Sequence, residues 1–72
     1  MILSMGEKIK ILLNRRNMTL TQLAEETGQS RQNMSNKMNR DNFSEKELHE
    51  IAKALNCTFE ANFTMNDTGD QI

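Results

Sequence analysis

The sequence predicts a small all-α domain of four helices followed by a short C-terminal β-strand. Ser or Thr is repeatedly followed, three residues later, by Glu or Gln, which is the pattern of a helix N-terminus. Apolar residues keep helical spacing as far as residue 56 and then alternate with polar ones over 57–65. A chain of 72 residues forms one domain with a small core, so a second subunit is the expected source of further stability.

The first helix begins after Ser4, which forms a capping pair with Glu7. The helix is predicted to end near Arg16, and apolar residues follow its period at Ile9, Leu12 and Leu13. This helix is the first of a helical core that is predicted over residues 4–56.

The second helix is short and is predicted over 20–27. Thr19 and Gln22 repeat the capping pair at its start. Gly28 follows its end, where glycine readily takes the left-handed conformation that closes a helix.

The third helix is predicted over 31–39, with Ser30 as its N-cap. Its only apolar residues are Met34 and Met38, one turn apart. The remaining positions carry amides, hydroxyls and cations and no acid. This composition is unusual for a helix face that is merely solvated.

The fourth helix begins after Ser44, which pairs with Glu47 as a third capping box, and it ends at Asn56. Phe43 and Leu48 are spaced as a hydrophobic staple around the cap. The apolar stripe of this helix is complete, at Leu48, Ile51, Ala52 and Leu55.

The C-terminal part is predicted as a strand over 57–65, followed by a turn and tail over 66–72. A single strand leaves its own backbone groups without partners. It therefore forms a local hairpin or pairs with the same strand of a second subunit, and we favour the homodimer. The dimerisation residues would be those of the apolar face, Phe59, Ala61, Phe63 and Met65.

Composition argues against an enzyme, a metal site or a bound cofactor. Cys57 is the only cysteine and His49 the only histidine, so no intrachain disulfide, metal set or catalytic triad is expected. A lone cysteine fits a reducing cytoplasmic setting, and no signal peptide or membrane span is expected. The net charge is −1, but residues 1–40 sum to +4 and residues 41–72 to −5, which favours a polyanionic partner for the first half.

The stretch from 19 to 40 is built as two helices around a tight turn. Ala24 is small enough for close helix approach, Gly28 permits the turn, and Met34 fills the space between the helices. Such a unit holds its second helix where it fits the major groove of DNA. The residues TLTQLAEETG (19–28), SRQNMS (30–35) and LHEIAKAL (48–55) resemble the Cro/lambda-repressor-type (XRE) helix-turn-helix family, over about residues 7–56.

The resemblance implies a lambda-repressor-like fold and a division of roles between the polar residues. Base edges would be contacted by Arg31, Gln32, Ser35 and Asn36. Phosphates would be contacted by Thr19, Thr21, Ser30, Asn39, Arg40 and Asn42. Arginine can grip guanine, and Gln or Asn can grip adenine, each through two hydrogen bonds.

Three positions depart from the pattern of the family. Leu13 and Leu20 stand where the family often has Arg and Gln, so we expect both to be packing residues. Lys37 stands where an apolar residue is usual, which suggests that the third helix is rotated or one residue longer. The change at Lys37 affects the expected positions of Asn36 and Asn39 more than those of Arg31 and Gln32.

The function predicted is sequence-specific binding of duplex DNA, by a repressor that occupies a palindromic operator as a homodimer. Two other classes of function stay open. The chain could be an antitoxin that binds a toxin protein and its own promoter, with its acidic second half covering a basic partner. It could also be a protein-interaction module that has lost DNA binding, as the missing anchors at Leu13 and Leu20 allow.

Overall fold

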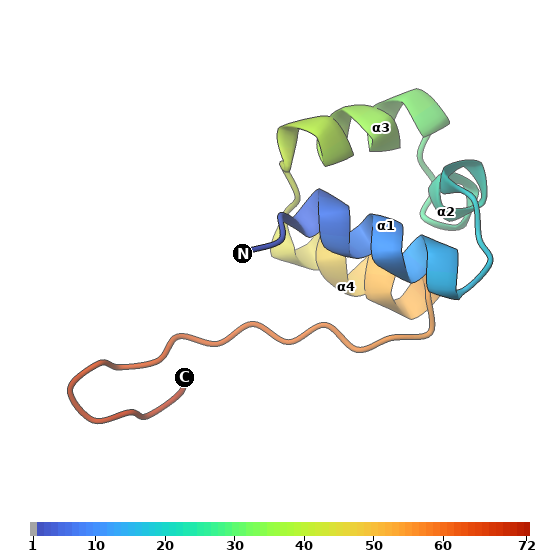
Figure 1. Ribbon diagram of the computed structural model, residues 1–72. Coiled ribbons are helices and arrows are strands. Elements are labelled where there is room, and N and C mark those ends of the chain that lie inside the picture. The colour runs from blue at the N-terminus through green and yellow to red at the C-terminus, as the bar shows by residue number, and fades with distance from the viewer. Residues whose placement is uncertain (1) are drawn as a thin grey trace.

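The computed structural model describes residues 2–72 and confirms the four predicted helices. In chain order they are α1 (Met5–Arg15), α2 (Leu20–Glu26), α3 (Arg31–Arg40) and α4 (Glu45–Ala54). In Figure 1, α3 lies along one side of α1 and α4 along the other, with α2 at one end. The helix α3, which carries the polar residues that the sequence analysis singled out, is thus at the periphery of the helical body.

Each helix begins at the cap that the sequence predicts. The hydroxyls of Ser4, Thr19, Ser30 and Ser44 each accept a hydrogen bond from the backbone N–H three residues further on. The capping box is complete at the first two. At Ser44 the predicted box is only half formed, because the Glu47 carboxylate accepts from the Ser44 hydroxyl and from Lys37. The prediction of a third full box was therefore wrong.

Each helix is followed by a residue in the left-handed backbone conformation, which turns the chain out of the helix. Gly28 follows α2 with a φ of 73°. Asn17, Asp41 and Asn56 take φ values of 52°, 54° and 55° after α1, α3 and α4. Asn and Asp tolerate this region better than other side chains do. Helix α3 runs to Arg40, one residue beyond the predicted end, as the position of Lys37 suggested.

The core lies between the four helices and consists of apolar side chains from all of them. Leu23, Met34 and Leu55 are the largest fully buried ones. Leu13 is buried and Leu20 packs against the core, which confirms that both are packing residues. The other buried apolar residues are Ile9, Ala24, Met38, Ile51 and Ala52.

A close contact between α1 and the end of α3 was not predicted. The backbone N–H of Gly6 donates to Asp41 Oδ1 at 2.8 Å, so Asp41 ends α3 and caps the first turn of α1. A Cβ at position 6 would stand 2.7 Å from the backbone oxygen of Met38. Glycine is therefore the residue that lets these two helices approach.

The strand predicted over 57–65 is not confirmed. Among residues 2–72, no backbone hydrogen bond involves residues 58–62. The single β-bridge joins Thr64 to Gln71, in a small hairpin at the end of the segment. An extended segment becomes a strand only beside a partner strand, and the helical body offers none, so the segment runs out from the body (Figure 1).

Candidate nucleic-acid interface

The outward side of α3 is polar, exposed and free of acidic residues. Met34 and Met38 occupy the inward side and are buried. The helical period of 3.6 residues places the opposite side at Gln32, Asn33, Asn36, Asn39 and Arg40, all of them exposed. We call these five residues the α3 face. It presents amide donors and acceptors and one cation to solvent.

Two amide pairs run along this helix. Gln32 Nε2 donates to Asn36 Oδ1 at 3.1 Å, and Asn33 Nδ2 donates to Gln29 Oε1 at 3.0 Å. The first pair spans one helical turn, the spacing at which helical side chains meet, and the second ties Asn33 to Gln29 in the turn before the N-cap Ser30. The amides are therefore partly oriented before any ligand binds, and each retains donors or acceptors that are free to bond a base edge.

Sequence reasoning missed Asn33 and Gln29. Asn33 lies on the α3 face, although the resemblance to a known family assigned it no role. The sequence did contain a signal for both residues. Gln29 and Asn33 are two amides at i, i+4 spacing, as are Gln32 and Asn36.

The predicted base-contacting residues lie along the first two turns of α3. Arg31, Gln32 and Asn36 are exposed, whereas Ser35 is half-buried at the edge of the α3 face. Gln32 and Asn36 are brought together by their hydrogen bond. Arg31, the first residue of the helix, is exposed but lies outside the α3 face, because helical period places it two turns before the buried Met38.

The predicted phosphate-contacting residues lie around the two ends of α3 and at the start of α2, and all are exposed. The hydroxyls of Thr19 and Ser30 already accept the capping bonds of α2 and α3. Each of these two hydroxyls keeps its own proton as a donor. Thr21 lies in the first turn of α2, and Asn39, Arg40 and Asn42 surround the C-terminal end of α3.

Lys37 does not belong to the α3 face. It is half-buried, and its Nζ lies 2.5 Å from Glu47 Oε2 on α4. The hydrogen bond from Lys37, with its positive charge and the Ser44 cap, lowers the pKa of Glu47, and partial desolvation opposes the shift. A charged residue is tolerated at this usually apolar position because a carboxylate on the neighbouring helix neutralises it.

The comparison with known families agrees with this geometry. Residues 8–61 match the family described as the Cro/C1-type HTH DNA-binding domain, and the match covers more than half of the chain. The chain belongs to this family. No curated protein and no solved structure matches it significantly.

The helix-turn-helix domain is thus a DNA-binding domain, and its fold explains where α3 stands. Within residues 2–72, no helix has the length and apolar character needed to cross a membrane. The family match also takes in the first residues after α4, as far as Ala61.

Arg16 of the helix-turn-helix domain is directed away from α3. Its guanidinium donates to the carbonyl oxygen of Asn56 at 3.2 Å and lies 3.8 Å from Cys57 Sγ. A cation at this place caps the C-terminal end of α4 and interacts favourably with the helix dipole. Its positive charge is therefore used within the fold and does not add to the α3 face.

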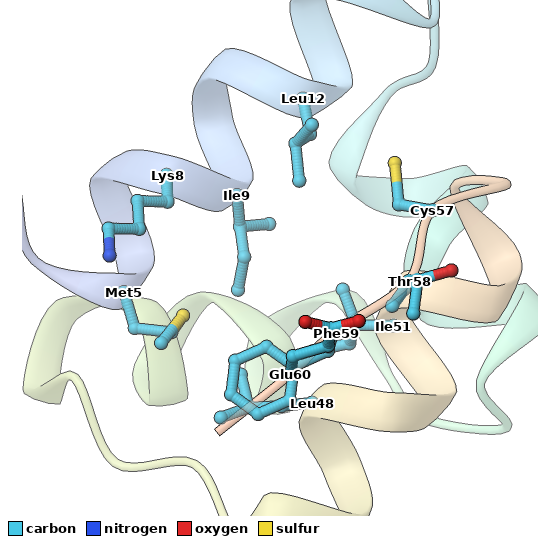
Figure 2. Close-up of a pocket in the computed structure, with 11 residues that line it drawn as sticks. Met5, Lys8, Ile9, Leu12, Leu48, Ile51, Cys57, Thr58, Phe59 and Glu60 are labelled. Atoms are coloured by element: carbon cyan, nitrogen blue, oxygen red, sulfur yellow. The ribbon is translucent and has the colours of Figure 1, made fainter. Parts of the chain in front are cut away.

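A groove between α1 and α4 receives the first residues of the C-terminal segment. Figure 2 shows Phe59 beside Leu48, with Ile9 of α1 directed toward the same space. The cavity there measures about 270 Å³. The Phe59 ring meets His49 edge-on, with ring centroids 5.3 Å apart. Of the predicted dimerisation residues, Phe59 is thus half-buried, whereas Ala61, Phe63 and Met65 are exposed.

Proposed function

We propose that this protein is a transcriptional regulator that represses by occupying an operator, which it reads with the α3 face. The observation that carries this proposal is the face itself: exposed, acid-free, rich in amides and held outside the core by Met34 and Met38. The amides of this face bond only to one another or to Gln29, so each keeps donors or acceptors for a ligand. An acidic or apolar face at this position would argue for a protein partner.

Base reading is assigned to the N-terminal half of α3. Arg31 has the fork geometry that bonds guanine O6 and N7, while Gln32 and Asn36 have the donor and acceptor that adenine N6 and N7 require. Ser35 contributes a hydroxyl at the edge of the face. The Gln32–Asn36 bond supports the assignment, because it restricts both amides before DNA binds.

Phosphate contacts are assigned to exposed polar groups on both sides of α3. Thr19, Thr21 and Ser30 precede it, and Asn39, Arg40 and Asn42 lie at its end. Such contacts set the register of a protein on the duplex without reading its sequence. Arg40 is the strongest of them because it carries a full charge.

A homodimer formed through the C-terminal segment would match a palindromic operator. A two-fold axis would place two copies of α3 one turn of DNA apart, roughly 34 Å. Two observations support the dimer: residues 58–62 have unpaired backbone groups, and Phe63 is 83% exposed. An unpaired backbone edge beside an exposed aromatic ring is a template for pairing with another chain.

The test is selection from a random duplex library at two salt concentrations, with the mass of the protein in solution measured alongside. We expect a palindromic motif, bound by a dimer, with an affinity that falls steeply as salt rises. Recovery of no duplex, even at low salt, would contradict DNA reading and point to a protein-interaction module. Co-purification of a small basic protein would point instead to an antitoxin.

A further inference from the structure

The hairpin at the C-terminus shows which edge of the C-terminal segment (residues 57–72) is free. Phe63 and Ile72 exchange both backbone hydrogen bonds, at 2.9 and 2.8 Å, and the Met65 N–H donates to the Asp70 carbonyl. Residues 63 and 65 therefore direct their backbone groups toward 70–72. Backbone groups alternate in direction along a strand, so Thr64 directs its groups to the opposite edge. A strand that continued this alternation would direct the groups of residues 58, 60 and 62 to the same edge, and none of these residues makes a backbone hydrogen bond within the described chain.

A second copy of the same segment fits this free edge. Two-fold symmetry makes the pairing antiparallel, with each residue opposite its symmetry-related position. Residues directly opposite each other in a sheet direct their side chains to the same face. The apolar residues of the segment have odd numbers. The apolar faces of the two copies therefore coincide only if odd-numbered residues lie opposite odd-numbered residues. The symmetry axis therefore passes through a residue, not between two.

Charge and length select which residue lies on the axis. An axis at Glu60 would set two carboxylates opposite each other, which is destabilising. An axis at Asn62 shortens the ladder, because residue 58 would then face position 66, inside the turn that follows Met65. An axis at Ala61 pairs 58 with 64 and 60 with 62, and uses the full length from the helical body to the turn.

We propose that two copies of this chain pair antiparallel along residues 58–64 with the two-fold axis at Ala61, so that Phe59 of each copy faces Phe63 of the other. The proposal rests on the dimer of the proposed function and adds its register and its contact residues. The occupant of the free edge is the same segment of a second copy.

The side chains favour this register. Odd residues form the pairs without mutual hydrogen bonds, in which the side chains approach most closely, so two phenylalanine rings can pack across the strands. Phe59 already lies in the groove between α1 and α4, whereas Phe63 is 83% exposed. Pairing carries the exposed ring of one copy to the groove of the other. Ala61, the smallest side chain on this face, stands where the two copies meet.

The register is tested by disulfide cross-linking in the full chain with Cys57→Ser as background. Ala61→Cys should give a covalent dimer on mild oxidation, because opposite α-carbons at the axis are about 4.5 Å apart, within disulfide range. Asn62→Cys is the matched control and should remain monomeric under reducing-agent-free electrophoresis, since its own symmetry mate lies more than about 8 Å away. Efficient cross-linking at 62 and not at 61 would overturn the register.

The contact between phenylalanines is tested by Phe63→Ala, with the dimer dissociation constant measured by sedimentation. We expect it to rise about 10- to 100-fold, with the helical circular dichroism unchanged because Phe63 lies outside the helical core. A native chain that stays monomeric would overturn the register and the dimer together, while DNA binding by α3 is judged separately by duplex selection. A dimer unaffected by Phe63→Ala would overturn the register alone.

Discussion

The helical body (residues 5–56) and the C-terminal segment satisfy their backbone and their apolar side chains in different ways. In the body, the backbone groups at the start of every helix are capped, and the apolar side chains of the four helices pack into one core. Residues 61–72 are all exposed, including Phe63 and Ile72, and residues 58–62 make no backbone hydrogen bond within the described chain. The helix-turn-helix body is therefore satisfied within one copy, whereas the segment leaves backbone groups and apolar side chains exposed, which is the basis of the proposed dimer.

The two methionines Met34 and Met65 give the sharpest contrast between these regions. Met34 is fully buried between α2 and α3, so Met34→Ala should lower the free energy of unfolding by about 2–5 kcal/mol, measured by urea titration. The same substitution at the exposed Met65 should change the unfolding of the helices by less than about 0.5 kcal/mol. Equal losses at both positions would show that the segment is part of the body.

Gly6 tests the close approach of α1 and α3. A Cβ there would meet the Met38 backbone oxygen, which cannot move aside as a flexible side chain can. Gly6→Ala should therefore lower the free energy of unfolding by about 1–2 kcal/mol, even after the roughly 1 kcal/mol gain in helix propensity. Gly69→Ala in the segment is the control and should leave the thermal unfolding of the helices unchanged. Stabilisation by Gly6→Ala would refute the contact.

Arg40 tests whether the end of α3 positions DNA. Arg40→Ala should weaken binding to all duplexes alike and reduce the slope of log affinity against log salt by about 1, because one phosphate contact is lost. Lys53→Ala, which removes an exposed charge from α4, should leave the slope unchanged. If the two variants behave identically, only overall charge matters and the assignment to Arg40 fails.

The ion pair between Lys37 and Glu47 should produce the smallest effect. Its carboxyl has a lowered pKa in the folded state, so its contribution is present above the unfolded pKa and is lost as pH falls through the folded value. Glu47→Gln should cost about 0.2–1 kcal/mol near pH 7, and this difference should shrink below about pH 4.5. Unfolding at several pH values checks it, and a cost of Glu47→Gln that is the same at every pH would contradict the ion pair.

Local chemistry made the helices predictable from the sequence to within one or two residues. Ser4, Thr19, Ser30 and Ser44 act within three residues of themselves, and apolar periodicity reports burial directly. The bond from Gly6 to Asp41 could not be predicted, because it joins residues 35 positions apart through a backbone contact. The ion pair of Lys37 with Glu47 could not be predicted either, because it depends on how α3 and α4 pack against each other.

The site and the segment were predictable in part. Apolar spacing predicted which side of α3 faces outward, and the family resemblance supplied the expected base-contacting residues. The resemblance assigned no role to Asn33, whose outward position follows from helical period alone. The strand over 57–65 was expected from alternation, which reports only which side chains share a face. Whether an extended segment becomes a strand depends on a partner, and the helical body supplies none for residues 58–62.

The central claim, that the α3 face reads bases, is tested most directly by the affinity of Gln32→Ala for the selected duplex and for its single-base variants. We expect the preference at one base pair to fall by about 1–3 kcal/mol, while affinity for unrelated duplexes stays the same. Asn14→Ala, which removes an exposed amide from α1, should keep the full preference. An unchanged preference in Gln32→Ala, or an equal loss in Asn14→Ala, would contradict the assignment of α3 as the reading helix.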